Sequence, residues 1–113
     1  MKNNYWEQLI ELSAQTRPKL DLKHRIDFKN CFGAIAGYAD CRMFISCGKF
    51  GIALRLPYDS FEEVFKSPDV GRLKYFPNGH IKRAYAVVPD RMILDKRYFS
   101  TLIDQSVDYV LGT

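Results

Sequence analysis

The sequence has 113 residues, 47% of them hydrophobic and 27% charged, and this composition predicts a single globular domain over residues 1–113. Seventeen Lys and Arg against thirteen Asp and Glu give a net charge of +4, which favours acidic partners but is too small an excess to diagnose nucleic-acid binding. No apolar run approaches the ~20 residues that a membrane span needs, and Glu7 and Glu11 interrupt the first apolar segment, so we expect a cytoplasmic protein.

The N-terminal element is predicted to be a helix that ends near Gln15. Asn4 and Glu7 have the spacing of a capping box, apolar residues then recur at helical intervals, and Pro18 enforces the stop. The basic segment 17–27 has no clean period, which is typical of a surface connection. The alternative is a phosphate-contacting loop formed by Lys19, Lys23, His24 and Arg25.

Residues 28–57 are predicted to form a three-stranded antiparallel meander, around which the other elements pack. Its strands are expected at about 28–38, 42–47 and 50–56. In the last of these, every second residue is apolar and the others are small or cationic, which assigns one face to the core. The apolar positions are Phe50, Ile52, Leu54 and Leu56.

Two glycines leave little side chain on the first predicted strand. Gly33 and Gly37 within a strand usually mark a bulge or the close approach of another backbone. We therefore predict that this flat surface receives a partner, either a second copy of the chain or another protein.

A short crossover helix is predicted after Pro57, capped by Asp59 with Glu62 and ending before Pro68. Near the C-terminus, Asp95 is predicted to cap a last helix with apolar residues at i, i+3 and i+4. The apolar residues just before that cap, Met92, Ile93 and Leu94, are expected to fill the core.

Between these helices, residues 73–88 are predicted to form a hairpin with a three-residue turn at Pro77-Asn78-Gly79. This register places Leu73, Tyr75, Ile81, Tyr85 and Val87 on one face. The opposite face then carries Arg72, Lys74, Phe76, His80 and Lys82. This basic face is the best candidate contact surface in the sequence, and its alternative is a solvated edge protected by lysines.

The sequence contains no motif that indicates catalysis or cofactor binding. No nucleophile elbow, phosphate-cradling glycine loop or paired acid and base is present, so neither catalytic nor cofactor-binding residues are predicted. The odd number of cysteines, Cys31, Cys41 and Cys47, favours reduced thiols over disulfides. A zinc site formed by them with His24 or His80 lacks the usual ligand spacing, and a reactive Cys47 would need a neighbouring cation.

The predicted order α-β-β-β-α-β-β-α and several short motifs resemble the N-terminal domain of the TfoX, or Sxy, family of bacterial competence regulators. Cys31-Phe32-Gly33-Ala34 stands where the family has Met-Phe-Gly-Gly, and Asp40-Cys41-Arg42-Met43-Phe44 where it has Asp-Gly-Lys-Met-Phe. Ile52-Ala53-Leu54-Arg55-Leu56 is similar to the family's Leu-x-Leu-Lys strand, and Tyr85-Ala86-Val87-Val88-Pro89 to its Tyr-x-x-Val-Pro ending.

This resemblance implies an α+β fold shared with secretion-chaperone-like proteins, a homodimer and a non-enzymatic role in transcriptional regulation or protein binding. The second domain of full-length regulators is not found in this sequence. The competing hypothesis is direct nucleic-acid binding through Arg72, Lys74 and Lys82, with Arg42 and Arg55 as further contacts. An enzyme or small-ligand binder ranks third.

Overall fold

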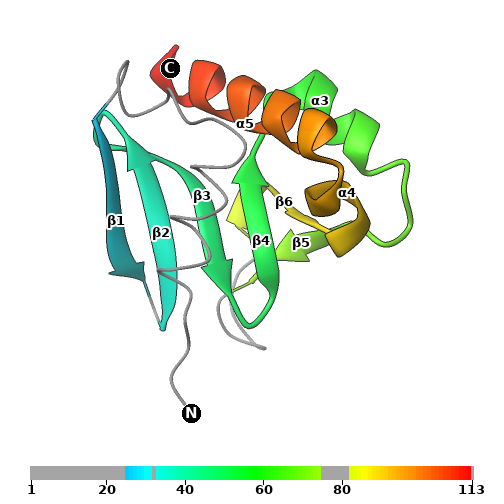
Figure 1. Ribbon diagram of the computed structural model, residues 1–113, viewed down its shortest axis with the longest axis horizontal. Coiled ribbons are helices and arrows are strands. Elements are labelled where there is room, and N and C mark those ends of the chain that lie inside the picture. Colours follow the sequence, from blue (N-terminus) through cyan, green and yellow to red (C-terminus); the bar gives the residue numbers. More distant parts are fainter. Residues whose placement is uncertain (1–24, 32, 75–81, 113) are drawn as a thin grey trace.

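A six-stranded antiparallel sheet forms the centre of the α+β fold seen in the computed structural model, which describes residues 25–31, 33–74 and 82–112 (Figure 1). The strands are β1 (Ile26–Cys31), β2 (Ala34–Ala39), β3 (Arg42–Gly48), β4 (Gly51–Arg55), β5 (Gly71–Leu73) and β6 (Lys82–Val88). The helices are α3 (Tyr58–Val64), α4 (Asp90–Leu94) and α5 (Lys96–Leu111). The strand order is β1-β2-β3-β4-β6-β5. The predicted N-terminal helix and the tip of the second hairpin lie outside the described residues.

The first predicted strand is in fact two strands. β1 and β2 pair antiparallel with Cys31 opposite Ala34, so the chain reverses at Gly33. Gly33 has a φ of 83°, a left-handed conformation that glycine adopts without steric cost. The prediction of one strand over residues 28–38 was therefore wrong, because Gly33 belongs to a tight turn and not to a strand interior.

Gly37, in contrast, lies beside a bulge. A bulge was one of the two alternatives that the sequence predicted for these glycines. The pairing of β2 with β3 shifts between Gly37 and Tyr38, and Phe44 of β3 has no partner on β2. Side chains normally alternate along a strand, but the extra residue lets both Phe44 and Ile45 belong to the same buried cluster. The bulge therefore adds a large ring to the core.

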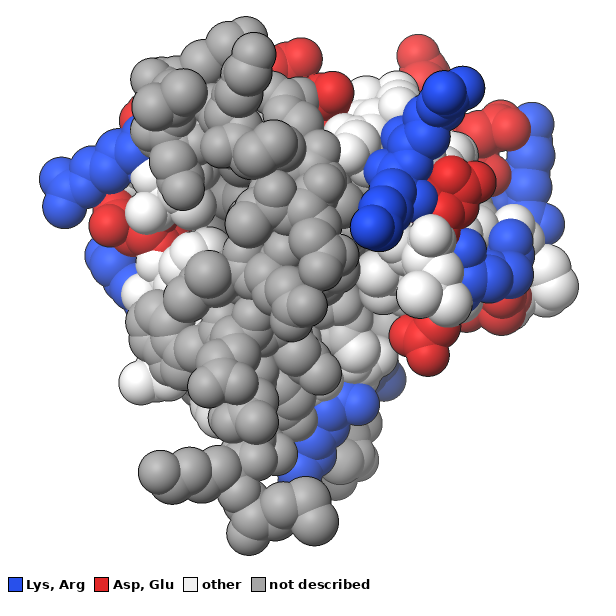
Figure 2. Space-filling model, in the orientation of Figure 1, with Lys and Arg blue, Asp and Glu red and all other residues white. Residues whose placement is uncertain are grey.

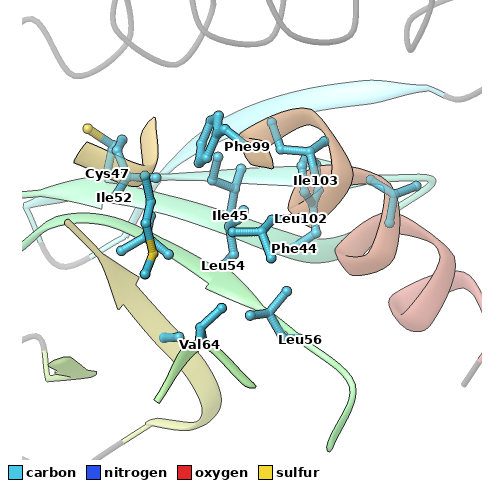
Figure 3. Packing of buried hydrophobic residues seen from close by; sticks show 14 of the residues in the cluster. Phe44, Ile45, Cys47, Ile52, Leu54, Leu56, Val64, Phe99, Leu102 and Ile103 are labelled. Atoms are coloured by element: carbon cyan, nitrogen blue, oxygen red, sulfur yellow. The ribbon is translucent and has the colours of Figure 1, made fainter. Parts of the chain in front are cut away.

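The main core lies between the sheet and the helices. α5 packs across β2, β3 and β4, and α3 packs on β6. Figure 3 shows strand residues such as Ile45 and Leu54 facing Phe99 and Ile103 of α5. A second buried cluster, formed by Ala53, Leu73 and Tyr85, is separate from this helix-side core.

Alternation predicted the face of β4 well but misplaced one residue. Ile52, Leu54 and Leu56 all belong to the helix-side core, as expected. Phe50 instead lies in the turn before β4 and packs against the second cluster. The predicted strand started one residue too early, because Gly51, with a φ of 107°, is where the pairing with Gly48 begins.

The helix caps agree with the sequence at α5 and differ at α3. The Asp95 carboxylate accepts a hydrogen bond from the Tyr98 amide over 3.2 Å, so the predicted N-cap of α5 is confirmed. The N-cap of α3 is Pro57 without a side-chain cap, and Asp59 lies inside the helix, so the predicted cap there was wrong. Leu94 is 79% exposed and does not fill the core, although Met92 does.

Three residues of the predicted apolar face lie together as expected, but the register of the hairpin and the position of Lys82, predicted on the face opposite Leu73, differ from the prediction. Leu73, Tyr85 and Val87 share one cluster. Leu73 pairs with Lys82 while Arg72 pairs with Ala86, so β6 carries extra residues at this point. Ala84 within this bulge has a φ of 66°. A uniform three-residue turn register cannot accommodate that bulge, which sequence alternation does not reveal.

The turn between β2 and β3 offers a test of backbone strain. Asp40 and Cys41 have φ values of 48° and 69°, as in a type I′ turn, whose second position favours glycine. Replacing Cys41 by glycine is expected to raise the free energy of unfolding by about 0.5–1 kcal/mol, because the left-handed cost of a side chain exceeds the chain entropy that glycine adds. Denaturant unfolding measures this gain. Cys41→Ala keeps the strain and serves as control, and an equal gain with alanine would contradict the explanation.

Candidate functional site

The predicted basic hairpin face is only partly within the described residues. Arg72 lies on β5 and Lys74 directly follows it, and both are exposed. Lys82 begins β6, but its side chain is not described, and Phe76 and His80 lie outside the described residues. The structure therefore places two of the five side chains.

Arg72 does not project from a solvated hairpin but lies against α3. Its guanidinium carbon is 5.2 Å from the centroid of the Phe65 ring and 5.8 Å from that of Phe61. These two rings lie 4.4 Å apart, Phe61 within α3 and Phe65 at its C-cap. Cation–π attraction at such distances favours one orientation of the guanidinium, so α3 positions Arg72.

A pocket of about 350 Å³ opens beside Arg72, and we call it the arginine–aromatic groove. Its lining residues are Leu56, Tyr58, Phe61, Glu62, Arg72, Ala84 and Tyr109. Tyr58 is 75% exposed although it is large and aromatic. α3 begins directly after β4, and α5 passes beside α3, so residues distant in sequence meet here (Figure 1). Aromatic side chains around a few polar groups are typical of binding sites.

The backbone of the groove wall is strained at Ala84. Its left-handed φ of 66° is uncommon for a residue with a side chain. The Leu56 amide donates to the Ala84 carbonyl oxygen over 2.9 Å, which ties the strained residue to the end of β4. Strain of this kind occurs preferentially at functional sites, which favours this groove over a featureless surface.

Two further arginines lie at the C-terminal end of α5. Arg42 donates from Nη1 to the Val110 carbonyl oxygen over 3.2 Å, and the guanidinium carbon of Arg55 lies 5.5 Å from the centroid of the Tyr109 ring. α5 has no basic residue in its last turn, so both cations complement the negative end of the helix dipole. Arg55 thus contacts a groove residue, Tyr109, and helps to position it.

The two glycines predicted as a flat partner surface have different surroundings. Gly33 is exposed in its turn. Gly37 is buried, and a Cβ placed on it would lie 2.5 Å from Cγ2 of Ile45 and 3.2 Å from Cε1 of Phe28. The space above Gly37 is therefore filled by this chain's own side chains, and the glycine is explained by internal packing.

Cys41 and Cys47 have different surroundings, while the side chain of Cys31 is not described and His24 and His80 lie outside the described residues. Cys41 is exposed in a turn, while Cys47 is buried in the helix-side core, where burial raises the pKa of its thiol to about 11. A raised pKa leaves little thiolate at neutral pH. Within ranges 25–31, 33–74 and 82–112, no three His, Cys, Asp or Glu side chains are grouped so that they could hold a metal ion.

No family model, curated protein or solved structure matches this chain. Among the described helices, none is long and apolar enough to cross a membrane. The groove geometry therefore carries the functional argument by itself.

Sequence reasoning found one cation of the groove but missed the groove itself. Arg72 was predicted as a contact residue, whereas Phe61 and Tyr109 lie in the two predicted helices, for which no contact role was predicted. The available signal was an aromatic residue, Tyr58, between Pro57 and the acidic Asp59, where no apolar stripe requires it. Periodicity could not show that the start of α3 and the end of α5 lie together.

Proposed function

We propose that this chain is a non-enzymatic interaction module that binds a protein partner through the arginine–aromatic groove. The observation that carries this proposal is Tyr58, an aromatic ring 75% exposed at the edge of a pocket lined by two further aromatic rings and an arginine. Aromatic residues and arginine dominate the energetics of protein interfaces. Exposing them costs solubility, which a binding role would justify.

We further propose a regulatory role in the cytoplasm, similar to that of the N-terminal domain of the TfoX regulators. The α+β fold with its antiparallel sheet is compatible with this resemblance. The family's Leu-x-Leu-Lys segment corresponds to β4, and its Tyr-x-x-Val-Pro segment to the end of β6. The likeness to secretion-chaperone-like folds and the homodimer belong to the same proposal, and light scattering would test the dimer.

Binding through the groove is tested with two matched surface variants. Tyr58→Ser removes the exposed ring, whereas Leu94→Ser removes a side chain that is 79% exposed and is not among the groove residues. Partners captured from an extract of the native organism are expected to be lost with Tyr58→Ser and retained with Leu94→Ser. For an isolated partner, we expect Tyr58→Ser to weaken binding at least ~10-fold. Equal binding of the two variants would contradict the proposal.

Direct nucleic-acid binding through the basic hairpin remains the alternative. Lys74 is exposed at the described edge of that surface, which is the observation in its favour. Such binding would weaken steeply with salt, with a slope of about one counterion per phosphate contact. An undetectable or salt-insensitive DNA shift would remove this alternative.

A further inference from the structure

The guanidinium of Arg72 contacts two aromatic rings and still has N–H donors for a ligand. Its guanidinium lies over the rings of Phe61 and Phe65. The ion pairs among the described residues are formed by Arg25, Lys66 and Arg91, so Arg72 pairs with no carboxylate there. A guanidinium that lies over aromatic rings still has N–H donors, arranged in a fork that matches a carboxylate. Arg72 is thus pre-positioned to receive one carboxylate.

The remaining groove wall is mainly apolar. Leu56, Phe61 and Tyr109 contribute buried or half-buried surface, and Tyr58 extends beside them. A volume of about 350 Å³ is at the low end of ligand pockets, and it accommodates one or two side chains rather than a folded element. The groove therefore offers an apolar subsite directly beside a carboxylate subsite.

The charge around the groove disfavours a polyanion. Glu62 lines the groove, and Asp59 lies on the same short helix, whereas Glu63 of that helix is paired with Lys66 over 3.0 Å. On the face of the molecule that Figure 2 shows, acidic and basic side chains are interspersed among the described residues, without one continuous basic area. A nucleic-acid backbone that crosses α3 would bring several phosphates close to these carboxylates, and like charges would repel. A single acidic side chain bound to Arg72 would be repelled by only one nearby carboxylate.

We infer that the arginine–aromatic groove binds a short acidic–apolar peptide segment of a partner protein. One Asp or Glu carboxylate pairs with Arg72, and a neighbouring apolar side chain packs against Tyr58, Phe61 and Tyr109. This inference rests on the proposed function, because it names the partner chemistry of the same site.

The probe is a random 12-residue peptide library displayed on phage and selected on the intact chain. Selected peptides are expected to share an acidic residue within a few positions of a Leu, Ile, Phe or Trp. A fluorescein-labelled copy of the strongest peptide is then titrated by fluorescence polarisation. Replacing its acidic residue by the corresponding amide is expected to weaken binding about 10-fold.

Charge variants of the chain are expected to change the affinity for the labelled peptide in opposite directions. Arg72→Gln is expected to weaken the labelled peptide about 10-fold, and Arg72→Lys to restore only part of this loss, because lysine lacks the planar fork. Glu62→Gln is expected to strengthen binding by roughly 2- to 5-fold, since a like charge is removed. Arg97→Gln, an exposed arginine of α5 that is not among the groove residues, controls for net charge and should change nothing.

Four results with peptides and charge variants would overturn the inference. These are selection of no peptide, selected peptides without an acidic residue, equal binding of the amide peptide, and equal losses with Arg72→Gln and Arg97→Gln. Preferential binding of single-stranded DNA with a salt slope of several counterions would likewise overturn it.

The variant Tyr58→Ser distinguishes failure of this inference from failure of the proposed function. If it abolishes binding of peptides that need no acid, the proposed function stands and only the acidic chemistry fails. If selected peptides bind Tyr58→Ser as strongly as the original chain, the groove itself fails.

Discussion

Replacing Phe44 by alanine is expected to lower the free energy of unfolding by about 3–5 kcal/mol, the usual cost of removing a buried aromatic ring. Phe44 is completely buried and is the residue of β3 that has no partner on β2. The Ser106 hydroxyl of α5 donates to the Phe44 carbonyl oxygen over 3.0 Å. The ring therefore fills the core where the bulge meets α5, and its loss leaves a cavity that the fixed backbone cannot easily close.

Urea unfolding followed by circular dichroism measures this effect. Met43→Ala is the matched control, because Met43 precedes Phe44 on the same strand but is only half-buried and packs on the second cluster. We expect Met43→Ala to cost about 1 kcal/mol, as is common for partly buried positions. Similar losses at the two positions would contradict the claim that the bulge directs Phe44 into the main core.

Alternation and local capping predicted much of this fold. Ile52, Leu54 and Leu56 revealed the core face of β4 because one face of a strand is buried and the period is two. Asp95 revealed the start of α5 because a cap depends only on neighbouring backbone amides. These signals are local, and therefore the sequence contains them in full.

Features that depend on pairing with another segment were not predictable in the same way. Gly33 is compatible with a bulge or with a turn, and only the pairing of Cys31 with Ala34 decides between them. The bulge at Ala84 places a left-handed conformation at a residue whose type does not favour it. Nothing in the local sequence marks such a position.

The candidate site shows the same division. The sequence identified Arg72 as a contact residue because cations on a hairpin are visible in its pattern. It did not identify the groove, because Tyr58, Arg72 and Tyr109 come from α3, β5 and α5 and meet only in the folded chain. An interface built from three separate elements has no sequence period.

Replacing Gly37 by alanine is expected to lower the free energy of unfolding by about 1–3 kcal/mol, the usual range for overpacking a core. Alanine is favoured over glycine in a strand, so the backbone term alone would give a small gain. The steric term decides the sign, because the new Cβ would lie 2.5 Å from Cγ2 of Ile45. That methyl group is attached at the branched Cβ of a buried residue and cannot rotate away cheaply.

A double-mutant cycle with Ile45→Ala isolates this contact. Ile45→Ala alone should cost about 2–5 kcal/mol through the cavity it leaves. In that background Gly37→Ala no longer meets the methyl group and fills part of the cavity, so we expect it to be neutral or stabilising, with a coupling energy on the order of 1–3 kcal/mol. Additive losses would show that Gly37 is required for another reason, such as contact with a second copy of the chain. Light scattering of Gly37→Ala beside the original chain would then distinguish that dimer contact from internal packing.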